Sequence, residues 1–170
     1  ATGRYLAGKV GRVFVVGAEG LRSTLLSAGL DLTDDWREAD AVVSGSNLAV
    51  TYDDFAAAGL AIQNGATFYA TNSDPSYPKP DGLYPGAGAI AAVISTTTGQ
   101  DPIFCGKPHE PMRSALAAIS GSFPLVVGDR PDTDLALGKA AGWATALVLT
   151  GVVGSADDVP REWTPDTVLT

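Results

Sequence analysis

The distribution of apolar and polar residues in the second half of the chain predicts a strand, a helix and a second strand. An apolar run over residues 124–127 stops just before Asp129, and a helical pattern then leads to Gly142. A second apolar run follows over residues 146–150. Near-continuous aliphatic strands joined by a helix are typical of a parallel sheet that is covered on both faces.

The first half of the chain carries the same two kinds of pattern. Apolar residues spaced three and four positions apart predict helices, whereas short runs of β-branched and aromatic residues predict strands. We expect strands over residues 11–17, 39–45, 68–70, 103–105 and 167–170, and helices over residues 19–28, 51–64, 89–97 and onward from Pro111. Thr51 is expected to cap its helix, and Gly29 and Gly99 are expected to end two others.

Two stretches between these elements are candidates for binding. The polar segment of residues 71–81 is too long for a tight turn, which predicts a functional loop that is either ordered or mobile. Residues 85–88 bring two glycines to the start of a helix, where open backbone N–H groups can bind an anion. Close packing is the alternative role of these glycines, and it is the one that we favour.

Asp129 stands at the carboxyl end of a predicted strand, the position at which sites gather in parallel sheets. Asp132 and Asp134 lie in the turn just beyond it, so the pattern predicts three neighbouring carboxylates. A cation would be needed to hold such like charges together, and carboxylate oxygens are ligands of Mg²⁺. The alternative roles are turn formation and capping of the next helix by Thr133 or Asp134.

Five motifs, in order along the chain, resemble the haloacid-dehalogenase (HAD) superfamily of phosphatases. They are ATNSDP (70–75), LYPGAGAI (83–90), GKP (106–108), GDRPDTDLALGKAAG (128–142) and LTG (149–151). Within the superfamily the chain resembles the NagD-like branch, which contains 4-nitrophenylphosphatases and phosphatases of nucleoside monophosphates, phosphoglycolate and glycerol phosphate. The resemblance covers nearly the whole chain.

The resemblance implies an α/β fold in two parts. Residues 1–100 would form most of an inserted α/β cap domain, with the end of a core helix at residues 1–6, and residues 101–170 would form the second half of a Rossmann-like core. The family's nucleophile and general acid lie on a strand that ends in D-x-D, and no apolar run of this sequence ends in that motif. We therefore expect a fragment, inactive by itself, whose nucleophile lies upstream.

The resemblance also implies roles for individual residues. Lys107 would contact both the nucleophile and the transferring phosphoryl group. Asp129 would bind Mg²⁺, and Asp134 would support the metal shell directly or through water. Asn72 and Asp74 would contact the substrate from a loop of the cap.

Simpler roles compete with the functional ones. A lysine such as Lys107 is usually a solvated surface residue, although its GKP context favours the functional role. His109, the only histidine, is a candidate substrate contact, and a structural role is the alternative that we favour. Cys105 is expected to be a small buried apolar residue, because no His-Cys-Asn set accompanies it. Pro131 and Asn47 depart from the residues that are usual in the family. The resemblance therefore says less about the geometry of the Mg²⁺ loop and the specificity of the cap.

Composition narrows the class of protein. The 170 residues have 45% hydrophobic content and 18% charge, which is ordinary for a globular protein. The net charge of −8, without any basic run, argues against a nucleic-acid partner. The apolar runs are too short to cross a membrane. One cysteine excludes an internal disulfide and suits the reducing cytoplasm, where we expect the protein to be located.

The function that the sequence predicts is Mg²⁺-dependent hydrolysis of a small phosphomonoester through an aspartyl-phosphate. A sugar, glycerol, glycolate or nucleotide phosphate would be the substrate, so the expected partner is a small phosphorylated metabolite. Association of two copies through the cap is left open. The alternative function is a non-catalytic α/β domain that binds a metal or a small ligand at the cluster around Asp129.

Overall fold

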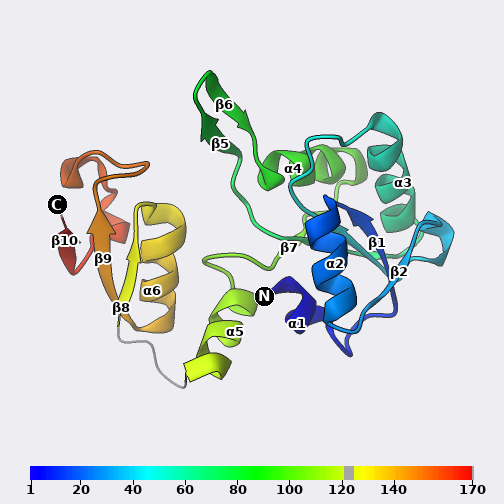
Figure 1. The fold of residues 1–170 in the computed structure, drawn as a ribbon, viewed down its shortest axis with the longest axis horizontal. Helices are drawn as coiled ribbons and strands as arrows, with labels where there is room; N and C mark the ends of the chain where they lie inside the picture. Colours follow the sequence, from blue (N-terminus) through cyan, green and yellow to red (C-terminus); the bar gives the residue numbers. More distant parts are fainter. Residues whose placement is uncertain (121–124, 170) are drawn as a thin grey trace. The chain divides into compact units, whose positions relative to one another are not determined.

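The computed structural model describes residues 1–120 and 125–169, and they form two compact units, Ala1–Gly106 and Lys107–Thr170 (Figure 1). Each unit has its own parallel sheet. Mixed α/β structure with parallel sheets is the predicted fold class, and it is confirmed. No helix of the described ranges is both long and apolar enough to cross a membrane.

The first unit is built on a five-stranded sheet whose order is β2-β1-β3-β4-β7. Every neighbouring pair is parallel. The strands are β1 (Arg12–Val16), β2 (Asp31–Thr33), β3 (Ala41–Ser44), β4 (Thr67–Ala70) and β7 (Ile103–Phe104). Four of them match predicted strands, whereas β2 has only three residues and leaves too short an apolar pattern to be recognised.

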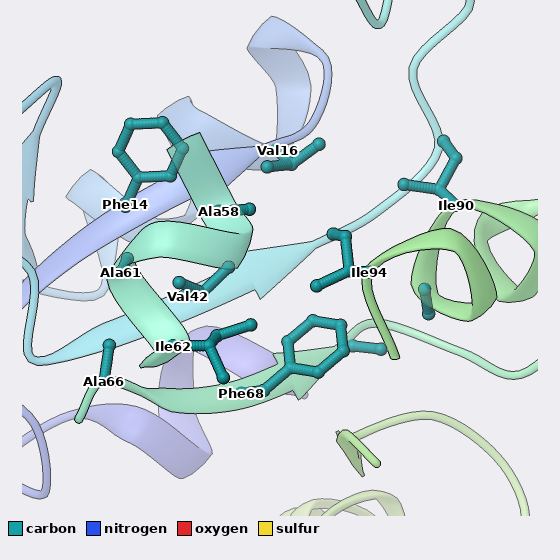
Figure 2. Close-up of a cluster of buried hydrophobic side chains, with 12 residues drawn as sticks. Phe14, Val16, Val42, Ala58, Ala61, Ile62, Ala66, Phe68, Ile90 and Ile94 are labelled. Atoms are coloured by element: carbon teal, nitrogen blue, oxygen red, sulfur yellow. The ribbon is translucent and has the colours of Figure 1, made fainter. Parts of the chain in front are cut away.

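Helices cover both faces of this sheet. They are α1 (Thr2–Leu6), α2 (Glu19–Ser27), α3 (Tyr52–Gln63) and α4 (Ala87–Thr98), and a 3₁₀ turn, η1 (Trp36–Glu38), precedes β3. Successive strand residues point to opposite faces, so Phe14 and Val16 pack with α3 and α4 while Val13 and Val15 pack with α1 and α2. Figure 2 shows the first of these clusters, in which Ile62 and Ile94 meet Phe68 of the sheet.

The local signals at the helix ends are confirmed. Thr51 and Asp54 form a reciprocal capping box at the start of α3, in which each side chain accepts a hydrogen bond from the other residue's backbone N–H. Gly99 ends α4 with a φ of 69°, and Gly142 ends the helix of the second unit with a φ of 70°. Such left-handed backbone suits glycine, which has no Cβ to clash.

The segment predicted as a loop at residues 71–81 contains part of a β-hairpin. Strands β5 (Ser76–Lys79) and β6 (Gly82–Pro85) pair antiparallel and form a separate two-stranded sheet. The rings of Tyr77 and Tyr84 lie opposite each other with centroids 6.2 Å apart, and the ammonium of Lys79 lies 4.3 Å from the Tyr84 ring. A loop without strands is therefore wrong for this segment.

The described residues of the second unit form a three-stranded parallel sheet with the order β10-β9-β8 and five helical segments before or between its strands. Its elements are α5 (Glu110–Ser120), β8 (Leu125–Gly128), a π-helical turn η2 (Pro131–Leu135), α6 (Ala136–Ala141), β9 (Ala144–Val148), the 3₁₀ turns η3 (Ala156–Asp158) and η4 (Arg161–Trp163), and β10 (Thr167–Leu169). Pro124 and Thr170, at the ends of two predicted strands, lie outside the described residues. The strand predicted over residues 146–150 begins earlier, at Ala144.

The first compact unit ends at Gly106, whereas the resemblance implied a division after residue 100. Residues 103–105 were expected in the second unit, but Ile103 pairs with Tyr69 and Phe104 pairs with Ala70 in the first sheet. Leu6 of α1 is fully buried in the core of the first unit. Pairing between strands 34 residues apart leaves no mark in a local pattern, so the boundary after Gly106 had to come from the structure.

Candidate active site

Asp129 directly follows β8, and the loop after β9 holds its side chain. The backbone N–H of Val152 donates a hydrogen bond to Oδ2 of Asp129 over 2.8 Å. Gly151 packs against the same carboxylate so closely that an added Cβ would overlap it. Parallel neighbours end at the same edge of a sheet, which explains how residues 23 positions apart meet there.

Asp134 lies in the π-helical turn η2, and its carboxylate is bonded to two donors. The ammonium Nζ of Lys107 lies 2.5 Å from Oδ1, and the backbone N–H of Arg130 donates to Oδ2 over 3.2 Å. The Asp134 side chain is only 8% exposed, whereas that of Lys107 is 45% exposed. Gly128 leaves the space that this carboxylate fills, because a Cβ there would overlap it.

The predicted group of three neighbouring carboxylates is wrong. Among residues 1–120 and 125–169 there is no set of three or more His, Cys, Asp or Glu side chains that could hold a metal ion together. Asp132 is exposed and pairs with the guanidinium of Arg130 at 3.4 Å, while Asp134 pairs with Lys107. Cations and amides of the protein itself therefore balance these carboxylates, which a local sequence pattern cannot foresee.

The side chains present fit part of a magnesium site. Asp129 uses Oδ2 for the Val152 amide, so its Oδ1 can serve as an oxygen ligand of the kind that Mg²⁺ prefers. Both oxygens of Asp134 already accept hydrogen bonds, one of them from a cation. This arrangement suits Asp129 as a direct ligand and Asp134 as a group that holds Lys107.

His109 lies at the start of α5, where its backbone carbonyl accepts hydrogen bonds from the N–H groups of Met112 and Arg113. Burial lowers the pKa of His109, and the positive charge of Arg113 lowers it further. The imidazole is therefore neutral at pH 7. A neutral ring can donate or accept one hydrogen bond but cannot offer a positive charge to a phosphate.

Asn72 and Asp74 belong to the first unit, and they bond to each other. The side-chain oxygen of Asn72 accepts the backbone N–H of Asp74 over 3.1 Å, which is an Asx turn. Gly106 packs directly on Thr71 and Asn72, where a Cβ would overlap. The amide nitrogen of Asn72 is the part of this side chain that remains for a substrate hydroxyl.

The start of α4 is closed by backbone. The N–H of Gly86 donates to the carbonyl of Pro75 and the N–H of Gly88 to that of Asp74, each over 2.9 Å. A Cβ on either glycine would overlap the carbonyls of residues 73–74. These glycines therefore allow close packing of residues 73–75, which precede the hairpin, on the start of the helix, as favoured from the sequence. Two of the N–H groups are not available to an anion.

Cys105 is fully buried beneath the sheet of the first unit. Burial raises the pKa of its thiol to about 11. A thiol with this pKa stays protonated at pH 7, so it is a poor nucleophile. The prediction of a small apolar residue is confirmed.

The structure adds three residues that the sequence reasoning missed as site residues. Gly128 and Gly151 leave room for the carboxylates of Asp134 and Asp129, and Val152 supplies a backbone donor. The available signal was a glycine near the end of each of two neighbouring strands, because Gly128 is the last residue of β8 and Gly151 lies in the loop after β9.

The second unit combines a parallel sheet, an aspartate after one strand, and a lysine paired with a second aspartate, which is the arrangement expected of a HAD-like domain. Residues 104–170 match the family described as HAD-hydrolase-like. The chain is 42% identical over 158 residues to the acid sugar phosphatase of Staphylococcus aureus, a match that covers 91% of this chain and 60% of that protein.

Two solved structures are similar over 99% of this chain. The p-nitrophenyl phosphatase from Archaeoglobus fulgidus has a TM-score of 0.91 and 36% identity, with 68% of its chain covered. The glycerol phosphate phosphatase from Mycobacterium tuberculosis in complex with magnesium has a TM-score of 0.90 and 36% identity, with 54% covered. The chain belongs to the NagD-like branch of the HAD phosphatase superfamily. It spans 60% of the length of the curated relatives that it matches.

Proposed function

We propose that this chain is part of a Mg²⁺-dependent phosphatase that hydrolyses a small phosphomonoester, such as a sugar, glycerol, glycolate or nucleotide phosphate. The observation that carries the proposal is the pairing of Lys107 with the buried Asp134 close in sequence to Asp129, within the segment that matches the family. The phosphatase names of the relatives support the same reaction.

In this proposal Lys107 binds the negative charge of the phosphoryl group. One side of its ammonium is held by Asp134, and its side chain is 45% exposed, so other N–H donors of the ammonium can reach an anion. Fixing the ammonium before the substrate arrives reduces the reorganisation that the reaction requires. Asp134 therefore acts by orienting Lys107.

Asp129, whose Oδ2 accepts the Val152 amide, would be a ligand of the magnesium ion. Bound Mg²⁺ neutralises charge on the phosphoryl oxygens. The remaining ligands and the attacking aspartate come, in the proposal, from parts of the protein outside these residues. No strand of the described ranges leads directly into a D-x-D sequence, which supports a nucleophile located elsewhere.

The first unit is the proposed cap, and its residues would select the substrate. Asn72 offers its amide nitrogen, and Asp74 is a further candidate for contacts to substrate hydroxyls. The neutral His109, which belongs to the second unit, is another candidate. Such groups discriminate between substrates by hydrogen bonding, because a site built for a hydroxyl rejects a molecule that lacks it.

The test compares the whole protein with the 170-residue chain. We expect the whole protein to hydrolyse 4-nitrophenyl phosphate and at least one sugar, glycerol or nucleotide phosphate when Mg²⁺ is present, and the 170-residue chain to hydrolyse none. Activity of the 170-residue chain would show that one of its own carboxylates is the nucleophile. Failure of the whole protein on every phosphomonoester would favour the alternative, a binding domain without catalysis.

A further inference from the structure

The backbone of the segment after β9 contacts the side chain of Asp129. Val152 donates its N–H to Oδ2 of Asp129 over 2.8 Å, across 23 residues of sequence. At Gly151 an added Cβ would overlap the Oδ2, Cγ and Cβ atoms of Asp129. The carboxylate is therefore held between a hydrogen-bond donor and a position that has room only for glycine.

Glycine is required at position 151 because a larger residue would overlap Asp129, and not because of the backbone conformation. Gly151 does not have the positive φ that makes glycine necessary at Gly142. An alanine could adopt the same backbone conformation, and the atoms nearest to its methyl group would be those of the Asp129 side chain. Gly154, three residues further on, has no positive φ, and a Cβ added there would meet no heavy atom within 4 Å.

We propose that Gly151 and the Val152 amide are positioning residues for Asp129. They fix the rotation of its carboxylate, with Oδ2 engaged by the amide and Oδ1 left for the metal ion. This inference rests on the proposed function, in which Asp129 is a ligand of Mg²⁺. Groups that hydrogen-bond to a metal ligand orient it, and their loss typically weakens metal binding by roughly 10- to 100-fold.

Replacing Gly151 by alanine should push the carboxylate away from its place and separate Oδ2 from the Val152 amide. Mg²⁺ affinity should fall by roughly 10- to 100-fold. The turnover number at saturating Mg²⁺ should fall much less, because the contact between Lys107 and Asp134 does not involve Gly151 or Asp129. A role of Gly151 in folding alone would not separate metal affinity from turnover in this way.

The experiment is a calorimetric titration of the whole protein with Mg²⁺ alone. Wild type, Gly151→Ala, Gly154→Ala and Asp129→Asn are compared. We expect Gly154→Ala to bind like the wild type, Gly151→Ala to bind roughly 10- to 100-fold more weakly, and Asp129→Asn to show no binding at this site. Equal affinity of Gly151→Ala and the wild type would overturn the inference while the Asp129→Asn result still supported the metal site. Unchanged binding by Asp129→Asn would instead reject the proposed metal ligand.

A second variant covers the case in which Gly151→Ala does not fold. Replacing Val152 by its α-hydroxy analogue turns the peptide N–H into an ester oxygen and removes the donor to Asp129 without adding an atom near it. Mg²⁺ affinity should again fall, by roughly tenfold. Wild-type affinity in the ester variant would show that the amide does not position the ligand.

Discussion

The contact between Lys107 and Asp134 should stabilise the second unit, and replacing Lys107 should cost more stability than replacing Asp134. We consider Lys107→Met, which keeps an apolar stem and removes the charge. Asp134, 8% exposed, would then keep only the Arg130 N–H among the hydrogen bonds described above. In Asp134→Asn, by contrast, the ammonium of Lys107 loses its carboxylate partner, but the Lys107 side chain is 45% exposed, so water can solvate it.

The size of the effect follows from distance and exposure. Two unit charges 2.5 Å apart attract by about 1.7 kcal/mol in a medium like bulk water and by about 6.6 kcal/mol at an effective dielectric constant of 20. Desolvation of the carboxylate offsets part of this attraction, and exposed pairs contribute about 1 kcal/mol or less. For this half-exposed pair we expect Lys107→Met to cost about 2 kcal/mol and Asp134→Asn about 1 kcal/mol.

Hydrogen exchange of the β8 and β9 amides in increasing denaturant measures these free energies in the second unit specifically. The double variant should be less destabilised than the sum of the two single variants, by about 1 kcal/mol. Additive effects, or a Lys107→Met cost below about 0.5 kcal/mol, would refute the reasoning. In the whole protein Lys107→Met should also lower turnover of every substrate by about 100-fold or more, since a donor to the transition state is lost.

Three further predictions concern specificity, acid stability and protection. Asn72→Ala and Asp74→Ala should change the relative kcat/KM values among phosphomonoesters more than the best turnover, and a uniform loss would reject a selective role. The hydrogen bonds from the hydroxyl and N–H of Thr145 lower the pKa of Asp166. Asp166 therefore stabilises the folded state above its unfolded pKa and loses this effect as the pH falls through its folded pKa. The difference in stability between the wild type and Asp166→Asn should therefore become smaller at acidic pH. Denaturation at a series of pH values measures this difference. In the 170-residue chain, amides of the buried strands β1, β3 and β4 should exchange more slowly than those of β8, whose Leu125 and Val127 are 47% and 51% exposed; the reverse order would contradict this account.

Local signals in the sequence were sufficient for most elements of the fold. The capping box of Thr51 and Asp54 lies within four residues, and the glycines at positions 99 and 142 stop their helices by their own backbone freedom. The hairpin of β5 and β6 was missed, although the sequence Pro80-Asp81-Gly82, which connects its strands and begins β6, is a strong turn signal. The polar composition of that segment obscured its strands.

The partners of the carboxylates could not be predicted locally. Asp129 and Asp134 were found because each follows a recognisable strand or motif, but Lys107 meets Asp134 across 27 residues and Val152 meets Asp129 across 23. The contact of Val152 with Asp129 depends on the register of β8 and β9, which only the packed sheet determines. The contact of Lys107 with Asp134 depends on how the segment before α5 packs against the turn η2. The pattern therefore suggested one shared cation, where the structure has a separate partner for each acid.

The rate of 4-nitrophenyl phosphate hydrolysis by the whole protein, measured against Mg²⁺ concentration for the wild type and Asp129→Asn, tests the central claim most directly. The wild-type rate should rise with Mg²⁺ and saturate. Asp129→Asn keeps the shape of the side chain but removes its charge, so its rate should be lower by about 100-fold or more and should no longer respond to Mg²⁺. Wild-type turnover in Asp129→Asn at saturating Mg²⁺ would contradict the assignment of this carboxylate to the metal ion.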